Sequence, residues 1–311
     1  MNKTGVVWDP IYAQHVMSTF HPESPARITR IKHVLDETEA GKRTIQIKAR
    51  PVTKEEIGWV HDKKYIDLVE STAGKNVLLD PDTTACPKTW EAACMAAGGV
   101  IEAVDEVVKG KIDNAYAFVR PPGHHAEHDR TMGFCFFNNI AIAAEYALKK
   151  LGIHRIAIID FDIHHGNGTE HHFYKRSDVF YISTHRWPFY PGTGNRTDHG
   201  QGLGTGHTLN IPLMKGDNEE FKDAYESVVL PVLEEYRPEL ILVSAGYDAH
   251  LDDPMGGFRI ETDTYNWLTK KLVEISKKVC GGKIIFVLEG GYSTDALAEC
   301  VEGALNILEE T

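Results

Sequence analysis

Short runs of apolar and β-branched residues alternate with longer segments of helical periodicity along the whole chain. The runs are continuously apolar instead of alternating with polar residues, which is typical of strands buried on both faces. Helical patterns between them predict a mostly parallel sheet covered by helices on both faces. The expected strands are 5–8, 44–48, 115–119, 156–160, 179–183, 208–212, 240–244 and 284–288.

The helical periodicity predicts seven main helices between these strands. Thr53, with Glu56 three residues later, has the pattern of a capping box and predicts one further short helix. The sequence contains no internal repeat, low-complexity tract or Pro/Gly/Ser-rich linker. We therefore predict a single α/β domain over residues 1–311, with all eight strands in one sheet. The expected helices are 24–40, 63–73, 88–109, 137–151, 219–235, 262–279 and 294–309.

The charge balance limits the kinds of partner. Lysine and arginine total 33 and aspartate and glutamate total 45, a formal net charge of −12. An acidic surface argues against direct nucleic acid binding, which needs a basic face. It mildly favours cationic substrates such as lysine-rich tails or polyamines, although the simpler explanation is that the charge keeps the protein in solution.

The chain has the composition of an ordinary globular protein, with 42% hydrophobic and 25% charged residues. No apolar run approaches the roughly 18–20 residues that span a bilayer, and the first residues do not resemble a signal peptide. The five cysteines are odd in number, widely spaced and without a CxxC pair. These features predict free thiols and a cytoplasmic protein without a membrane partner.

The most informative segment is DFDIHHGNG at 160–168, which follows the buried run RIAII. It places Asp160, Asp162 and His164 in alternation where a parallel strand ends. Ligands and metals gather outside the carboxyl ends of such strands. Because side chains alternate along a strand, Asp162 and His164 point to the same side and can reach one small cation.

Three more strand ends carry unusual chemistry. They are the segments 118–139, 240–258, which includes Asp248, and 284–292, which ends in Tyr292. Two carboxylates and one imidazole from Asp162, His164 and Asp248 suit Zn²⁺, and Fe²⁺, Co²⁺ or Mn²⁺ accept the same donors. The sequence therefore predicts a catalytic metal site.

An amide hydrolase also needs a base for water and an acid for the leaving amine. The neighbours His124 and His125 can supply both if each ring is oriented by a partner, and Asp160 and Asn167 are candidates. Tyr292 could place its hydroxyl on the developing oxyanion. Each residue alone has an ordinary structural explanation, and only their occurrence together at the ends of four strands indicates a catalytic site. His171 and His172 are expected on an exposed helical face without a role, and loop solvation is expected to explain His128, His185, His207 and His250.

Six strings along the chain resemble the histone deacetylase family, in its class II-like branch with acetylpolyamine amidohydrolases and bacterial deacetylase-like proteins. They are HPESPARI (21–28), RPPGHHAEHDRTMGFCFFNN (120–139), DFDIHHGNGTE (160–170), PGTG (191–194), SAGYDAHLDDPMGG (244–257) and LEGGY (288–292). The resemblance implies the arginase/deacetylase fold, an eight-stranded parallel sheet flanked by helices.

The resemblance also implies roles for the residues at the strand ends. Asp162, His164 and Asp248 would bind one Zn²⁺ per chain. His125 would be the general base and also the acid for the leaving amine, and Tyr292 the transition-state tyrosine.

Further implied roles concern the residues around this centre. His124 would be the electrostatic partner of the base and would pair with Asp160. Asn167 would pair with His125; the class I pattern has an aspartate at that position, so this is a class II-like feature. A structural K⁺ would be bound by Asp160 and Ser183 with nearby backbone carbonyls.

The implied substrate-binding residues are Phe134 and Tyr190 as tunnel walls, with Gly133 beside them, Met255 at the rim and Asp82 as the acid that holds the substrate backbone. Family members more often have a phenylalanine where Tyr190 stands. Met255 offers no carboxylate for a second ammonium group, which favours acyl-lysine over polyamines.

Four functions remain open from the sequence. The preferred one is a zinc-dependent deacylase for acyl-lysine in peptides or proteins, and the second is an amidohydrolase for acetylated polyamines or other small amides. A non-catalytic acyl-lysine binding protein and an arginase-like ureohydrolase with two metals are the others. The acyl chain length and the oligomeric state, including a homo-oligomer, are also left open.

Overall fold

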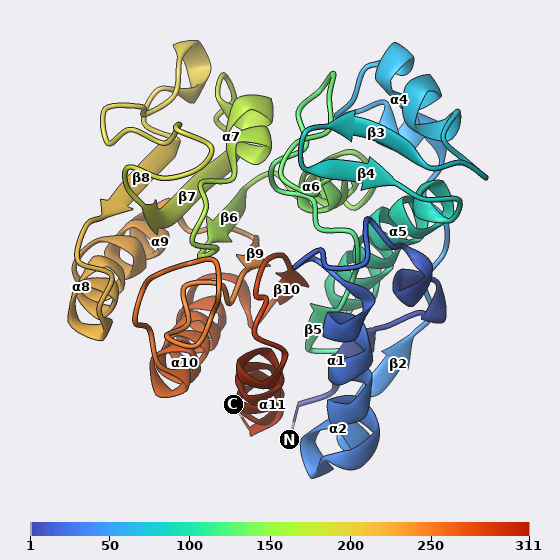
Figure 1. Ribbon diagram of the computed structural model, residues 1–311. Helices are drawn as coiled ribbons and strands as arrows, with labels where there is room; N and C mark the ends of the chain where they lie inside the picture. The colour runs from blue at the N-terminus through green and yellow to red at the C-terminus, as the bar shows by residue number, and fades with distance from the viewer. Residues whose placement is uncertain (1, 311) are drawn as a thin grey trace.

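Eight parallel strands form one sheet in the computed structural model, which describes residues 2–310. Their order across the sheet is β2-β1-β5-β10-β9-β6-β7-β8 (Figure 1). All eight correspond to the strands expected from the sequence, and β7 runs further than expected. The bounds are β1 Thr4–Val7, β2 Ile45–Ile47, β5 Asn114–Ala117, β6 Ile156–Asp160, β7 Val179–Arg186, β8 Thr208–Leu213, β9 Leu240–Ala245 and β10 Ile284–Leu288.

Helices cover both faces of the sheet, as the continuous apolar strands predict. On one face α5 contacts β1, β5 and β10, and α6 contacts β9; on the other, α10 contacts β9 and α11 contacts β1 and β5. The fold is therefore the predicted single α/β domain, of which residues 1 and 311 lie outside the described part. The helices are α1 Pro25–Glu37, α2 Glu39–Arg43, α3 Lys54–Ile57, α4 Lys63–Glu70, α5 Thr89–Val108, α6 Asn139–Lys150, α7 Asn167–Phe173, α8 Asn218–Ala224, α9 Leu230–Tyr236, α10 Thr262–Cys280 and α11 Thr294–Glu310.

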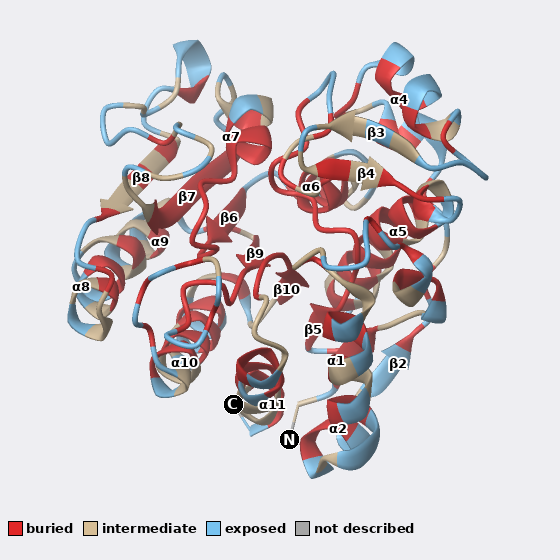
Figure 2. Cartoon of the chain, viewed as in Figure 1, coloured by how far each residue is buried: buried red, intermediate tan, exposed pale blue. Residues whose placement is uncertain are grey.

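The core lies between the sheet and these helices. Every residue of β5, β6, β9 and β10 is buried, and the inward faces of the helices are buried with them (Figure 2). Local signals explain several helix starts. Thr53 and Glu56 form the predicted capping box of α3, and the Asn138 side chain accepts from the Ala141 N–H at the start of α6.

Three elements differ from the sequence prediction. The expected helix 219–235 is divided into α8, a π-helical turn at Tyr225–Val229 and α9, because Pro231 has no N–H for the regular helical ladder. The expected helix 24–40 ends at Glu37, since Thr38 caps α2 with its side chain. A two-stranded hairpin, β3 Val77–Asp80 and β4 Thr83–Ala85, was not expected because its strands are short and partly exposed.

The strand order determines where the unusual loops meet. The strands β5, β10, β9 and β6 are consecutive neighbours, and the segments that follow them are the four singled out in the sequence. Their carboxyl ends lie together at one edge of the sheet, in the middle of the molecule (Figure 1). Within residues 2–310, no helix is long and apolar enough to cross a membrane.

Candidate active site

Three potential metal ligands converge at the carboxyl ends of β6 and β9. His164 Nδ1 lies 3.0 Å from Asp162 Oδ1 and 3.1 Å from Asp248 Oδ2. All three residues are buried, and among residues 2–310 they form the one His/Cys/Asp/Glu group with ligand atoms within 4.8 Å of each other. The structure thus brings together two carboxylates and one imidazole at a single point.

The donor atoms fit a divalent cation. The imidazole nitrogen of His164 faces two carboxylate oxygens, an arrangement that is unfavourable unless a proton or a metal lies between them. Burial lowers the pKa of His164, but the hydrogen bonds to Asp162 and Asp248 outweigh it and raise the pKa to about 10. This point of the structure therefore strongly favours positive charge.

Backbone donors hold the remaining carboxylate oxygens. The Gly290 N–H donates to Asp162 Oδ2 at 2.8 Å, and the Ile163 N–H donates to Asp248 Oδ1 at 2.9 Å. Such contacts orient metal ligands and are part of a metal site. The close approach of both carboxylates also explains why residue 290 is a glycine, because a Cβ there would lie 2.2 Å from Asp248 Oδ2 and 2.6 Å from Asp162 Oδ2.

Beside the ligand cluster, the two neighbouring histidines have different partners. His124 Nδ1 lies 3.0 Å from Asp160 Oδ2, and His125 Nδ1 lies 2.7 Å from Asn167 Oδ1. Because an amide oxygen only accepts, the His125 Nδ1 carries a proton and its Nε2 is left with a free lone pair. The sequence predicted both pairings, and the rings lie with their centroids 4.0 Å apart.

The two histidines also differ in charge. Burial lowers the pKa of His124, but Asp160 and Asp162 more than compensate and raise it to about 10. Burial holds the pKa of His125 well below its ordinary value, and the charges of His124 and His164 lower it further. These surroundings favour the protonated form of His124 and the neutral form of His125.

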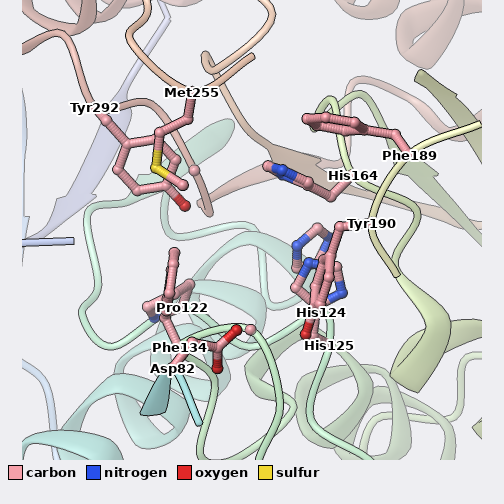
Figure 3. Close-up of a pocket in the computed structure, with 12 residues that line it drawn as sticks. Asp82, Pro122, His124, His125, Phe134, His164, Phe189, Tyr190, Met255 and Tyr292 are labelled. Carbon is pink, nitrogen blue, oxygen red and sulfur yellow. The ribbon is translucent and has the colours of Figure 1, made fainter. Parts of the chain in front are cut away.

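A cavity of about 220 Å³ opens onto these groups. Tyr292 and Met255 lie on one side of it and Tyr190 on the other, with the Tyr292 hydroxyl pointing inward (Figure 3). All five predicted substrate-binding residues line it. The lining residues are Asp82, Pro122, His124, His125, Gly133, Phe134, His164, Phe189, Tyr190, Met255, Gly290 and Tyr292.

Three lining residues had no predicted role: Gly290, described above, Phe189 and Pro122. Phe189 stacks on the His164 ring, with centroids 5.1 Å apart and planes at 16°, so it restricts the orientation of that ligand. Its position next to Tyr190 was the available signal. Pro122 lines the cavity two residues before His124, and nothing in its spacing distinguished it from a loop proline.

Tyr292 has a neutral hydroxyl in this cavity. Burial raises its pKa well above the ordinary value, and Asp248 and Asp162 raise it further, so the hydroxyl remains a hydrogen-bond donor. The Arg27 guanidinium lies over the tyrosine ring at 5.2 Å, and the Phe134 ring meets it edge-on at 6.1 Å. These contacts hold the ring against the cavity wall.

The residues of the expected potassium site lie on adjacent strands. Asp160 on β6 and Ser183 on β7 are direct neighbours in the strand register. Asp160 Oδ2 also accepts from the Tyr181 hydroxyl at 3.2 Å, and Ser183 Oγ lies 2.9 Å from His185 Nδ1. The position of these side chains is compatible with a cation site, which stays a prediction.

Loop solvation does not explain every other histidine. His185 is buried on β7, and His250 is buried after β9, so both expectations were wrong. On α7 His171 is exposed as expected, but it contacts Glu127. His172 is only partly exposed and lies 2.7 Å from Glu145 Oε1.

Comparison with known proteins identifies the class to which this fold and site belong. The histone deacetylase domain model matches residues 21–308. Histone deacetylase 10, chloroplastic, of Oryza sativa subsp. japonica is 40% identical over 300 residues, which cover 90% of this chain and 68% of that protein. A probable deacetylase of Archaeoglobus fulgidus is 38% identical over 97% of this chain and 83% of its own.

Two further matches agree with these. The histone deacetylase-like amidohydrolase of Pseudomonas aeruginosa is 38% identical over 93% of this chain and 76% of its own. The crystal structure of the HDA15 HD domain superposes with a TM-score of 0.94 at 34% identity, covering 100% of this chain and 91% of that one. The protein belongs to the histone deacetylase family, and its deacetylase and amidohydrolase relatives support amide hydrolysis as the class of reaction.

Proposed function

We propose that this protein is a zinc-dependent deacylase that removes acetyl or other acyl groups from lysine side chains. The observation that carries the proposal is the asymmetric histidine pair, in which His124 contacts the Asp160 carboxylate and His125, with a free Nε2, contacts the Asn167 amide. Both rings line one cavity with Tyr292 and the proposed ligand His164. This combination supplies an acid, a base and an oxyanion donor within one cavity.

Asp162, His164 and Asp248 would hold the metal. A bound divalent ion would supply Lewis acidity to the scissile carbonyl and lower the pKa of water. Zinc is the preferred ion for two carboxylates and one imidazole, and Fe²⁺ or Co²⁺ would fit the same donors.

The protein's own residues would move the protons. His125 Nε2 takes a proton from the attacking water, while Asn167 holds its Nδ1–H. The Tyr292 hydroxyl donates to the oxyanion as it forms, and the cationic His124 stabilises the negative charge beside it. His125 then gives its proton to the departing amine nitrogen, so that acetate and a free amine leave.

The shape and lining of the cavity favour an acyl-lysine side chain. Phe134 and Tyr190 supply aromatic walls for an aliphatic stem, and Gly133 leaves room beside them. Met255 at the rim carries no charge. Asp82, also in the lining, would accept from the substrate backbone. The same carboxylate could instead bind a second ammonium group, which makes acetylated polyamines the second candidate substrate.

The test is release of free amine from an acetyl-lysine peptide and from acetylputrescine, with the purified protein before and after chelation. Turnover of the peptide that disappears with the chelator and returns with Zn²⁺ is expected. Greater turnover of acetylputrescine would favour the polyamine alternative. Undiminished turnover by metal-free protein, or no turnover of either amide by metal-loaded protein, would contradict the proposal.

Metal stoichiometry separates two less favoured functions. An arginase-like ureohydrolase needs two metals, whereas residues 2–310 contain one suitable ligand group; a ratio near one per chain supports the deacylase. A non-catalytic acyl-lysine binding protein would bind the acetylated peptide without releasing amine. Structural K⁺ at Asp160 and Ser183, a homo-oligomer and a cytoplasmic location stay predictions.

A further inference from the structure

Glu127 contacts Asn167 and lines a different cavity from the one that the histidine pair lines. Its buried carboxylate accepts from Asn167 Nδ2 at 2.5 Å, and both of its oxygens lie within 2.9 Å of His171 Nδ1. Its backbone is held as well, because the N–H donates to the Arg130 carbonyl and the carbonyl lies 2.8 Å from His61 Nδ1. The carboxylate is thus fixed against the amide that contacts His125.

The orientation of the Asn167 amide determines which nitrogen of His125 carries the proton. With the amide oxygen toward His125, Nδ1 is the donor and Nε2 can act as a base. With the amide turned over, its NH₂ group would face Nδ1, and the proton would be forced onto Nε2. A carboxylate in place of the Asn167 amide would have no such ambiguity, because both of its oxygens accept.

We propose that Glu127 is a positioning residue that locks the Asn167 amide and thereby sets the tautomer of His125. The inference rests on the proposed function, in which His125 Nε2 receives a proton. Turning the amide over would place its oxygen against the Glu127 carboxylate, where no hydrogen bond can form. A longer contact of 3.3 Å from Asn167 Nδ2 to the His125 carbonyl favours the same orientation, but the bond to a charged acceptor is the stronger of the two.

His171 completes this arrangement. Its side chain is about half exposed on α7, and its hydrogen bond to Glu127 raises its pKa, which favours the protonated ring next to the buried carboxylate. A second cavity of about 190 Å³ is lined by Glu127 and His171. A connected series of contacts therefore runs from this outer cavity through His171, Glu127 and Asn167 to the proposed base.

The chain offers a matched control. Glu145 is also a buried glutamate that pairs with a histidine of α7, His172 at 2.7 Å, yet none of its hydrogen bonds or ion pairs reaches Asn167. Glu145→Leu removes a comparable buried pair without touching the histidine pair. It controls for loss of stability that has no connection with the tautomer.

The first experiment compares Glu127→Leu with Glu145→Leu in metal-loaded protein, measuring kcat and KM on an acetyl-lysine peptide together with metal content and thermal unfolding. Glu127→Leu is expected to lower kcat by about 10- to 100-fold with KM and metal content little changed, while Glu145→Leu keeps the wild-type kcat. A wild-type kcat for Glu127→Leu, or an equal loss in both variants, would overturn the inference.

A rescue keeps the inference testable if Glu127→Leu does not fold. Asn167→Asp alone brings two carboxylates together and is expected to lose activity. In the double variant Glu127→Gln/Asn167→Asp, the NH₂ group of the new glutamine donates to the new carboxylate at position 167, which still accepts from His125. Recovery of kcat above that of Asn167→Asp is expected, and no recovery would contradict the proposed lock.

The tautomer can also be observed without any turnover. Long-range nitrogen–proton spectra of histidine-labelled protein report which ring nitrogen of His125 is protonated, with His125→Asn identifying the signals. The Nδ1–H form is expected in the wild type and a loss of that form in Glu127→Leu. An unchanged tautomer would refute the inference, whereas failure of the wild type to hydrolyse amides would refute only the proposed function.

Discussion

The Tyr292 backbone N–H donates a 2.6 Å hydrogen bond to Asp253 Oδ2. The same oxygen accepts from the Ser293 N–H at 3.3 Å, and Asp253 Oδ1 accepts from the N–H groups of Met255 and Gly256. One buried carboxylate therefore joins the loop after β10 to the loop after β9. The position of the Tyr292 hydroxyl and that of the Met255 rim depend on the same side chain.

We predict that Asp253→Asn lowers both activity and stability. Whichever way the new amide is turned, its NH₂ group faces backbone N–H donors that it cannot accept from. We expect kcat to fall by about 10- to 100-fold because Tyr292 shifts, and the thermal midpoint to fall with the lost buried bonds. Asp252→Asn is the control, since Asp252 is exposed. Equal kcat values for the two variants would contradict the prediction.

Removal of the Tyr292 hydroxyl tests its role directly. Tyr292→Phe keeps the ring contacts with Arg27 and Phe134 but removes the donor to the oxyanion. Turnover should fall by roughly 10²- to 10³-fold, while metal content and thermal stability stay at wild-type values. Full turnover in this variant would show that the hydroxyl has no part in the reaction.

Much of the fold could be predicted from the sequence because its strands are continuously apolar. The run at 156–160 and the acidic residues after it indicated both a buried strand and its carboxyl end. The polar residues after the other strands predicted one shared edge. The strand order β5-β10-β9-β6, which makes the segments following them neighbours, depends on pairings between distant parts of the chain and does not appear in any local pattern.

Other parts of the site had no sequence signal of their own. The hairpin β3–β4 brings Asp82 to the cavity, but its strands of four and three residues are too short to show a clear alternation of apolar and polar positions. The stacking of Phe189 on His164 depends on how two loops meet. Glu127 follows the histidine pair in the same motif, and its type and spacing did not indicate a role. Its contact with Asn167 becomes visible only in the structure.

Gly290 provides a test of the metal site that leaves every proposed ligand in place. In Gly290→Ala the new Cβ would lie 2.2 Å from Asp248 Oδ2, so the carboxylate or the loop must move. We expect the affinity for Zn²⁺ to fall by about tenfold or more. Chelator competition monitored by residual bound metal measures it.

Gly58→Ala is the control for this substitution. Gly58 ends α3 with ordinary helical backbone angles, and its added Cβ would come no closer than 3.1 Å to another atom. It should bind Zn²⁺ as the wild type does. If Gly290→Ala also kept wild-type affinity, the proposed ligand geometry at Asp162 and Asp248 would be wrong.

A buried neutral histidine predicts how stability depends on pH. His61 lies 2.8 Å from the Glu127 carbonyl through Nδ1, and its Nε2 accepts from the Asn138 N–H at 2.9 Å. Burial lowers its pKa to about 3 in the folded protein, whereas an unfolded histidine has a pKa of about 6.5. The unfolded chain therefore binds the additional proton as the pH falls below about 6.5.

The difference between the folded and the unfolded pKa of His61 determines the direction in which stability changes with pH. The contribution of His61 to stability is fully present above about pH 6.5 and is lost progressively as the pH falls toward about 3. Between about pH 7.5 and pH 5 the loss from this residue amounts to about 2 kcal/mol. Urea unfolding at the two pH values should show a smaller decrease for His61→Gln than for the wild type. An equal decrease in both proteins would mean that His61 is protonated in the folded state, and the hydrogen bond from the Asn138 N–H to Nε2, which requires the neutral ring, would then have to be reassigned.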